Sequence, residues 1–441
     1  MLGPLNSGDL ESLCPECFRV IPADLRQTAT ELLLSKVCPV HGTFETPVAT
    51  DLAAYKTIAG APRQVKLPSR FGSSHGKGCP DDCGLCPAHD QHTCLAILEI
   101  TSRCELGCPI CLSSSCVLGE DLSIDQVKVC LSSLISQEGR VAPLQLSGGE
   151  PTLHPQLSKI ITTADSLGFT KIEIDTNGIR LAEDPSFAER LREAGLTGVY
   201  LQMDSLRPDV CQRLRGKDLV DRKLRAIENC QTADLQVVLS AMVVPGLNDH
   251  LLWEMVLFGV EKKVTGVNFQ SLTLSGRVPR SLFNHSRRFT QTHFGRSLEE
   301  QSGGSIKAVD FTPIPCPDPR CGALAYVLIR NGRLMPLGRI VEAESLLGPT
   351  AGLSDWGALI RQLDEGGCGC IKGCVPDNDD PFLALGEIFV DSDFFSIGYH
   401  GMMDAYDFDL ERARRCCVHE LTPEGRLIPF CLYNVKYRGG K

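Results

Sequence analysis

The sequence predicts an α/β protein with a parallel sheet, flanked by cysteine-rich extensions that bind metal. From residue 95 to about 275, strand-like apolar runs alternate with helical patterns, and this alternation is typical of βαβ units. There are six such units, whereas a complete TIM barrel has eight. Outside this region the chain is rich in cysteine, which accounts for 22 of its 441 residues. A chain of this length favours two or three domains.

The expected strands and helices follow one another in order along the core. We expect strands at Leu95–Thr101, Leu144–Ser147, Lys171–Asp175, Gly198–Gln202, Leu235–Val244 and Gly266–Gln270. We expect helices at about 123–136, 155–168, 185–195, 219–231 and 249–262. In parallel α/β sheets, ligands bind at the carboxyl ends of the strands. Several residues lie at these strand ends, namely Glu150, Thr176, Asn177, Gly178, Gln202, Asp204, Gln270 and Ser275. Each of them either contacts a ligand or only caps a helix or turn.

The composition argues against several classes of protein. The formal net charge of −10 is unsuited to a nucleic-acid binder, which needs a basic face. No apolar run approaches the roughly 20 residues of a transmembrane helix, and the first residues lack the basic and apolar segments of a secretory signal. Cysteines in CxxC-type clusters then indicate metal binding rather than disulfides. Because oxygen-sensitive clusters require a reducing compartment, we expect a cytoplasmic protein.

The most informative motif is a Cx3Cx2C triplet, Cys104-Glu-Leu-Gly-Cys108-Pro-Ile-Cys111, which directly follows the first expected strand. A cubane [4Fe–4S] cluster normally takes four thiolates, so three would leave one iron open to a chelating ligand. This arrangement resembles the radical S-adenosylmethionine (SAM) superfamily, in which the open iron binds the amino and carboxylate groups of SAM. Zinc is the alternative, but a tetrahedral zinc site needs a fourth nearby ligand and usually a different spacing.

A second motif, Gly148-Gly149-Glu150-Pro151, follows the second expected strand. Glycine lets the backbone approach a ligand closely, and a carboxylate at a strand end can hold an ammonium group. Alone, such a stretch could be a simple turn. After a Cx3Cx2C triplet, it resembles the SAM amino-group motif of the superfamily, which implies a partial (β/α)6 TIM-like barrel. The implied catalytic residues are Cys104, Cys108, Cys111 and Glu150, and the implied cofactor contacts are Gly148, Gly149 and Glu150. From their positions at strand ends, we expect Asn177 and Asp204 to be hydrogen-bond partners of the SAM ribose or the substrate.

The first sixty residues contain two further cysteine knuckles. They are Cys14-Pro-Glu-Cys17 and Cys38-Pro-Val-His41-Gly, and their separation resembles a zinc-ribbon or rubredoxin-like site. We expect a mononuclear metal bound by all four side chains in a domain spanning 1–60. The ligand types do not decide between iron and zinc. The alternative is a pair of turns with free thiols.

A second Cx3Cx2C triplet lies in the segment 61–94, which otherwise reads as a linker. It is Cys79-Pro-Asp-Asp-Cys83-Gly-Leu-Cys86, and Cys94 or His92 could provide a fourth ligand. A site with four ligands would leave no iron open for SAM. We therefore expect an auxiliary cluster here and the SAM cluster in the core, 95–300, where the other triplet follows a strand and precedes a helix.

The segment 301–441 is expected to form a C-terminal domain with another auxiliary cluster. Its candidate ligands are Cys316, Cys321, Cys416 and Cys431. The segment 323–340, with Asn331-Gly332 at its centre, predicts a β-hairpin. The roles of Cys368, Cys370 and Cys374 stay open between metal ligands and free thiols, and we expect ordinary core or loop positions for Cys116, Cys130, Cys211 and Cys230.

Longer motifs narrow the resemblance to one family. The CPEC…CPVHG opening, the CPDDCGLCPAHDQHTCLAILEITSRCELGCPIC run, MDAYDFDLERARRC and RCCVHELTPEGRLIPFCLYN cover most of the chain. They are similar to the family of archaeal tetraether lipid synthase and its relatives, which includes class D radical SAM methyltransferases acting on a dihydropterin. The resemblance implies one SAM-binding [4Fe–4S] cluster, one or two auxiliary clusters and a rubredoxin-like iron or zinc site.

The family implies a transferase that forms carbon–carbon bonds by radical chemistry. A reductant such as flavodoxin or ferredoxin delivers one electron, SAM is cleaved to a 5′-deoxyadenosyl radical, and Glu150 orients SAM. The favoured substrate is a small heterocycle that is methylated with a folate-type methylene donor. Coupling of lipid alkyl chains is the alternative, and a non-enzymatic iron–sulfur electron-transfer protein is a weaker one, because it has no need of the GGEP motif or the barrel.

Overall fold

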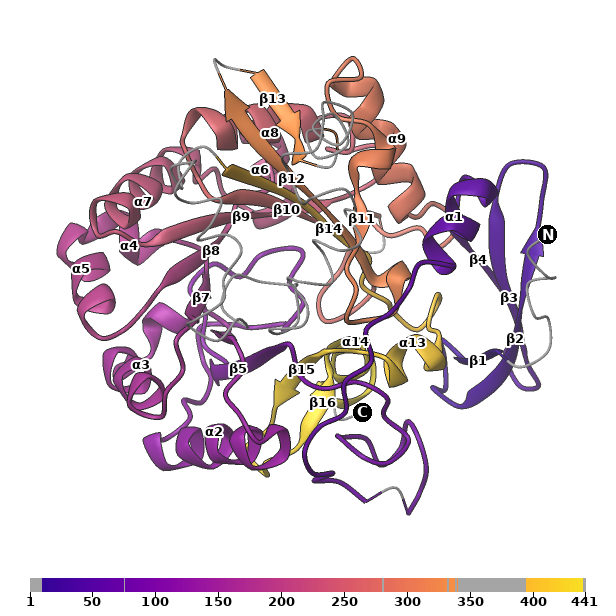
Figure 1. Cartoon of the computed structure of the whole chain (residues 1–441), viewed down its shortest axis with the longest axis horizontal. Helices are drawn as coiled ribbons and strands as arrows, with labels where there is room; N and C mark the ends of the chain where they lie inside the picture. Colours follow the sequence, from indigo (N-terminus) through magenta and orange to yellow (C-terminus); the bar gives the residue numbers. More distant parts are fainter. Residues whose placement is uncertain are drawn as a thin grey trace, which may run out of the picture.

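The computed structural model describes residues 10–74, 76–279, 281–330, 333–337, 339 and 394–438. The Asn331-Gly332 turn and the trio Cys368, Cys370 and Cys374 lie outside the described residues. The described chain forms a small N-terminal antiparallel sheet and one large curved sheet (Figure 1).

The centre of the large sheet is built from six parallel strands in chain order. These are β5 (Leu95–Thr101), β6 (Leu144–Gly148), β7 (Ile172–Thr176), β8 (Gly198–Gln202), β9 (Gln236–Val243) and β10 (Gly266–Ser271). The helices that follow them are α2 (Ile124–Glu138), α3 (Leu157–Ser166), α4 (Ile179–Glu183), α5 (Pro185–Glu193), α6 (Pro208–Arg215), α7 (Val220–Thr232) and α8 (Leu252–Glu261). The predicted α/β class and six-unit core are confirmed, although the sequence patterns do not predict the short helices α4 and α6.

The hydrophobic core lies between the sheet and the helices on its outer side (Figure 1). Because side chains alternate along a strand, every second residue faces the helices. On β6 these are Leu144 and Leu146, and on β7 they are Ile172 and Ile174, all fully buried. The remaining strand positions face the concave side of the sheet, which is the side that a barrel encloses.

The C-terminal residues extend this same sheet at both edges. Strand β14 (Phe394–His400) pairs in parallel with β10, and β15 (Val418–Leu421) pairs in parallel with β5. The described residues thus contain eight parallel strands in one sheet. Antiparallel strands flank them: β16 (Leu427–Pro429) beyond β15, and β12 (Gly322–Arg330) beyond β14. The expected boundary near residue 300 therefore separates segments that share a sheet.

The remaining elements lie around these two edges. Strand β13 (Arg333–Pro336) pairs with β12 in the expected hairpin, and β11 (Thr312–Pro313) pairs with its other end. The helices of this part are α9 (Gln291–Gln301), α13 (Leu410–Arg414) and α14 (Phe430–Leu432), which continues into a turn of π-helix at Tyr433–Tyr437.

The N-terminal sheet is an antiparallel ribbon. Its strands are β1 (Leu10–Leu13), β2 (Val20–Gln27), β3 (Leu32–Cys38) and β4 (Gly42–Ala49), and helix α1 (Leu52–Ala59) follows them. Lys36 attaches the ribbon to the C-terminal segment. It is a buried lysine, only 1% exposed. Its Nζ donates to Ser12 Oγ, Leu13 O and Ala405 O at 2.9, 2.8 and 2.6 Å. Three acceptors offset the desolvation of this ammonium group.

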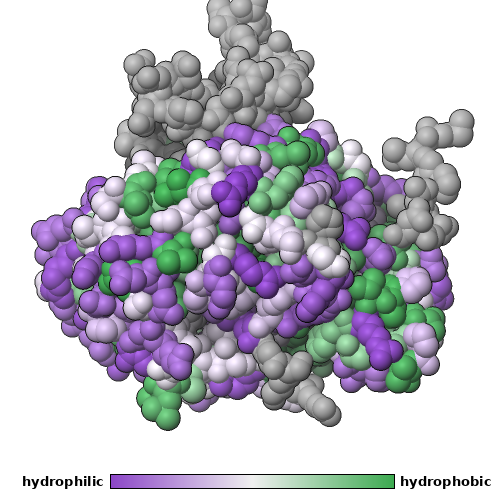
Figure 2. All heavy atoms as spheres, turned by 90° about the horizontal axis from the view of Figure 1, so that it is seen from below, coloured by the Kyte–Doolittle hydropathy of each residue, from purple (hydrophilic) through white to green (hydrophobic). Residues whose placement is uncertain are grey.

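No helix among the described residues is long and apolar enough to cross a membrane. On the face shown in Figure 2, hydrophilic side chains predominate and apolar ones form small separate patches.

Candidate active site and metal centres

The cysteine triplet lies in the loop between β5 and α2, at the carboxyl end of the sheet. Cys104 and Cys108 are each 8% exposed and pack with Leu106, Ile179 and Leu219, while Cys111 is partly buried against them. The sequence order of the elements thus brings the three thiols into one largely apolar pocket. The sequence pattern predicts this position, directly after a strand and before a helix.

Arg277 fixes the shape of this loop. Its Nε donates to Cys108 O at 2.7 Å, and its backbone N–H and carbonyl both pair with Cys111 at 2.9 Å. From the other side, Arg215 Nη1 donates to Ile110 O at 3.2 Å. Two arginines therefore hold backbone carbonyls of the loop and leave the three sulfur atoms available.

The three thiols fit an iron–sulfur cluster better than a single metal ion. A tetrahedral metal with Zn–S bonds of about 2.3 Å holds its sulfur ligands about 3.8 Å apart. Where the structure describes the chain, two groups of donor atoms lie within 4.8 Å of one another, and this triplet is not one of them. Burial raises the pKa of Cys104 to about 12. Deprotonation there requires a nearby cation such as cluster iron.

The two glycines of the GGEP motif are required by the chain itself. A Cβ on Gly148, whose φ is +135°, would lie 2.1 Å from Thr101 O. A Cβ on Gly149 would lie 2.2 Å from Arg103 O. The glycines thus let this loop pack directly against the start of the cysteine loop. Their contact with SAM stays a prediction.

Glu150 is buried at the centre of a hydrogen-bond network. Its Oε1 accepts from the hydroxyls of Thr152 and Thr176, each at 2.6 Å, and its Oε2 accepts from Asn177 N at 2.7 Å. Burial raises the pKa of this carboxyl. The network fixes the carboxylate at the ends of β6 and β7, beside the cysteine loop. Thr152 is a residue that the sequence motif alone does not identify.

Glu105, between the first two cysteines, provides a further acceptor. Its Oε1 accepts from Asn177 Nδ2 at 3.1 Å. Its Oε2 is buried and has no hydrogen-bond partner among the described residues. A buried acceptor of this kind normally has a donor, so the arrangement fits a bound ligand that brings N–H or O–H groups, as SAM does.

Asp204 serves as a support in the structure. Arg215 donates to both of its carboxylate oxygens, from Nε at 2.6 Å and from Nη2 at 2.8 Å, and Met242 N donates at 3.0 Å. Lys223 Nζ donates to Asn177 O at 2.5 Å and to Gln202 Oε1 at 2.9 Å. Burial lowers the pKa of Lys223 to about 8. The sequence alone identifies neither cation: Arg215 lies on the short helix α6, which the sequence patterns do not predict, and Lys223 lies on α7, whose helical pattern alone does not mark a buried cation.

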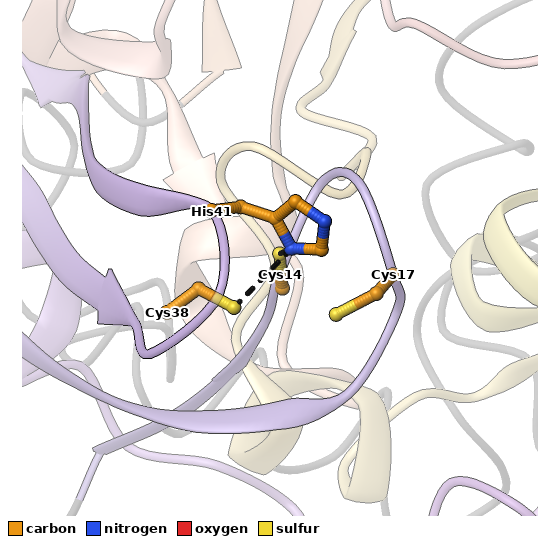
Figure 3. A group of neighbouring side chains, drawn as sticks. All are labelled: Cys14, Cys17, Cys38 and His41. Atoms are coloured by element: carbon orange, nitrogen blue, oxygen red, sulfur yellow. Dashed lines mark hydrogen bonds between the residues drawn. The ribbon is translucent and has the colours of Figure 1, made fainter.

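The ribbon holds a compact set of metal ligands (Figure 3). The donor atoms of Cys14, Cys17, Cys38 and His41 all lie within 4.8 Å of one another. His41 Nδ1 lies 3.5 Å from Cys14 Sγ and 3.4 Å from Cys38 Sγ. Backbone N–H donors of Val40 and His41 lower the pKa of Cys38 to about 6, which favours a thiolate. Four converging donors are the set that tetrahedral zinc or iron requires.

The cysteines of the second triplet lie against the C-terminal end of the chain. Cys83 is buried with Phe408 and Leu432, and Cys79 and Cys431 pack against the same cluster. Tyr437 Oη accepts from Cys83 N at 3.1 Å, which fixes the triplet to the last helical turn.

The structure groups the other cysteines around two places. Cys94, Cys316 and Cys417 share one buried cluster, and His92, Cys94 and Cys316 bring donor atoms within 4.8 Å of one another. Cys321 instead receives a hydrogen bond from Arg412 Nη2 at 3.5 Å. Burial, and then the charges of Cys431, Cys417 and Cys321, raise the pKa of Cys416. Cys316 therefore lies in one buried cluster with Cys94 and Cys417.

The remaining described cysteines occupy ordinary positions. Cys130 and Cys230 are fully buried in the main core, Cys211 is buried on α6, and Cys116 is exposed.

Two family models match the chain. The Radical SAM superfamily model matches residues 98–259, which include the cysteine triplet and Glu150. The HMPTM N-terminal zinc ribbon domain model matches residues 7–50, which include the four ribbon ligands. Together with the barrel and the cluster of three thiols, they define a radical SAM enzyme with an N-terminal metal site. Membership implies a [4Fe–4S] cluster and SAM.

One relative matches nearly the whole chain. The 7,8-dihydro-6-hydroxymethylpterin dimethyltransferase of Methanocaldococcus jannaschii is 31% identical over 477 residues, which cover 97% of this chain and 93% of the relative. The chain belongs to the family of this enzyme and is a radical SAM transferase. The expected resemblance is confirmed.

Other similarities cover a smaller share of this chain. A probable GTP 3′,8-cyclase of Methanothermobacter marburgensis is 31% identical over 38% of this chain and 56% of the relative. Among solved structures, SuiB of Streptococcus suis gives a TM-score of 0.40 at 16% identity, covering 48% of this chain and 47% of SuiB. The radical SAM methyltransferase TsrM of Kitasatospora setae gives 0.30 at 14% identity, with coverages of 40% and 36%.

Proposed function

We propose that this enzyme methylates a reduced pterin at carbon, using radical chemistry begun by SAM. The observation that carries the proposal is the near-complete alignment with a dihydropterin dimethyltransferase, 97% of this chain against 93% of the relative. The alignment reaches beyond the core that radical SAM enzymes share and includes the ribbon and the C-terminal segment. The lipid-coupling alternative has no comparable support.

The residues of the site have separate tasks in this reaction. Cys104, Cys108 and Cys111 would hold the cluster, which with SAM bound supplies a 5′-deoxyadenosyl radical. Glu150 and Glu105 would hold the amino and hydroxyl groups of SAM through their carboxylate oxygens. The apolar side chains around the thiols, Leu106, Ile179 and Leu219, exclude water from the reacting atoms.

Auxiliary clusters form the second part of the proposal. One site would use Cys94 with Cys316, and another would use Cys321 with Cys416 and Cys431 near the Cys79/Cys83/Cys86 triplet. A flavodoxin or ferredoxin in the cytoplasm would deliver the electrons. Loss of one cluster signal in both C94A and C316A, and of a different signal in C321A, is the expected result in electron paramagnetic resonance. Loss of the same signal in all three variants would contradict the grouping.

The activity is tested with the full-length chain, reconstituted with iron and sulfide without oxygen. The enzyme is incubated with 6-hydroxymethyl-7,8-dihydropterin, SAM, a reductant and a methylene-bearing reduced folate. Mass spectrometry should detect methylated pterin, and methyl-deuterated SAM should leave the product unlabelled if the carbon comes from the folate. The C104A/C108A/C111A variant is the control without activity. Consumption of GTP or of a lipid, with the pterin unchanged, would contradict the proposal.

A further inference from the structure

The concave face of the barrel is unusually polar. In TIM barrels the inward side chains are mainly branched apolar residues that fill the interior. Here alternation and strand register place many polar groups inward, because Glu99 pairs with Ser147, Asp175 with Tyr200, and Gln202 with Ser240. Polar residues on this face include Glu99, Ser147, Asp175, Tyr200, Gln202, Ser240, Asn268, Gln270, His400 and Glu420. Such a surface is suited to a polar ligand.

Asp175 stands out on this face because no hydrogen bond or ion pair within the described chain offsets its charge. It is partly buried, and its carboxylate has no hydrogen-bond or ion-pair partner among the described residues. Burial, followed by the charge of Glu150, raises its pKa to about 7. The other charged groups that act on it are Arg215 and Lys223, which lower the pKa, and Glu99, which raises it.

Glu173 on the same strand shows the ordinary arrangement. It lies two residues earlier and on the same face as Asp175, and it forms an ion pair with Lys171 at 3.2 Å. One carboxylate of β7 is thus compensated within the chain, and the other is not.

A second acceptor nearby also lacks a donor. Asn268 Nδ2 donates to Tyr200 Oη, and Gln270 Nε2 donates to the same oxygen at 2.9 Å. Asn268 Oδ1 is buried and has no partner among the described residues. Tyr200 is the strand-register neighbour of Asp175. The concave face therefore offers acceptors that call for a ligand carrying N–H donors.

The position of Asp175 relates this face to the SAM site. The next residue, Thr176, donates to Glu150 at 2.6 Å. A ligand held by Asp175 therefore lies immediately beside the GGEP motif, where a substrate of the radical must be.

We propose that Asp175 binds the 2-amino-4-oxopyrimidine edge of the pterin, accepting parallel hydrogen bonds from its 2-amino group and N3–H. A carboxylate matches two parallel N–H donors, as it does in bidentate pairs with arginine. This assignment rests on the proposed function and identifies the part of the substrate that the enzyme recognises.

The first test uses the unaltered holoenzyme and two ligands. Binding of 6-hydroxymethyl-7,8-dihydropterin and of its N3-methyl analogue is measured by pterin fluorescence, without oxygen or reductant. The analogue lacks one donor and should bind roughly 10- to 100-fold more weakly, the range for a lost hydrogen bond to a charged group. Equal binding of both ligands by the unaltered enzyme would overturn the proposal without any variant.

The second test compares Asp175→Asn with Glu173→Gln, a matched control on the same strand and face. D175N should bind the pterin at least tenfold more weakly and lose most of the discrimination against the N3-methyl analogue. E173Q should retain both and should still cleave SAM reductively without pterin. If the unaltered enzyme binds no pterin, the proposed function and this assignment fail together. If D175N methylates and discriminates normally, the assignment alone fails.

Discussion

The ribbon metal site and the barrel site use thiols in opposite arrangements. In the ribbon, three sulfur atoms and an imidazole nitrogen lie within 4.8 Å of one another, and the ion they suit would have no free position. In the barrel, three thiols lie in an apolar cluster without such close approach, and Glu105 Oε2 beside them has no donor among the described residues. A closed ligand set stabilises a fold, whereas an open one can take a substrate. The two sites should therefore respond differently to the same kind of substitution.

The largest expected effect separates the two sites completely. The C104A/C108A/C111A variant should lose reductive SAM cleavage by at least about a thousandfold, because the cluster that carries the electron has no ligands. The ribbon metal should remain, as measured by metal analysis. C116S, which alters an exposed cysteine of the same loop, should keep full activity. Cleavage in the triple variant would show that the other Cx3Cx2C triplet binds SAM.

The next effect concerns the open site alone. Glu150→Gln retains the shape of the side chain but replaces one carboxylate oxygen with an NH2 group, which cannot accept a hydrogen bond. The dissociation constant for SAM should rise about tenfold, consistent with the loss of one charged hydrogen bond. Equilibrium dialysis with labelled SAM measures this, and the iron content should not change. An unchanged affinity for SAM would mean that Glu150 only accepts the hydrogen bonds of the two threonines and does not bind SAM.

The reverse experiment opens the closed site. C14S/C38S should release the ribbon metal and lower the midpoint of thermal unfolding by about 5 °C, as expected for a loss of about 2 kcal/mol in a domain of ordinary size. Calorimetry measures the shift, and metal analysis identifies the loss. SAM cleavage per cluster should persist, because the ribbon ligands do not contact the barrel cysteines. Loss of the cluster in this variant would mean that the sites are coupled.

The smallest effect is one of stability at the open site. The pKa of Asp175 rises from its ordinary value of 3.8 to about 7 in the fold. Between these values the folded chain binds more protons than the unfolded chain, so the free energy of unfolding decreases as the pH rises through this window. D175N removes this penalty and should gain about 1 kcal/mol at pH 8, after allowance for partial exposure. The gain should shrink toward pH 5 in denaturant titrations.

The strands of the core could be predicted from local patterns, because each one carries its own alternation of apolar and polar residues. The same is true of the ribbon ligands, whose spacing is local. The positions of β14 and β15 could not be predicted, since their pairing with β10 and β5 joins segments more than a hundred residues apart. Cys316 shows the same limit, because its neighbour Cys94 comes from a distant segment.

The positions of the two cations beside the cysteine loop also could not be predicted from local sequence patterns. Arg215 and Lys223 look like solvated residues on short amphipathic helices, yet both are fixed beside the cysteine loop. Their role depends on the curvature of the sheet, which no single motif encodes.

The two C-terminal strands at the sheet edges have a consequence for the order of synthesis. Strands β5 to β10 leave the ribosome before β14 and β15, so both edges of this six-stranded core remain unpaired until residues 394–421 have been synthesised. Exposed edges invite pairing with other chains. Iron loading of the barrel cysteines before that point would take place on a chain with two open sheet edges, and a nascent chain halted near residue 300 would be a target for chaperones.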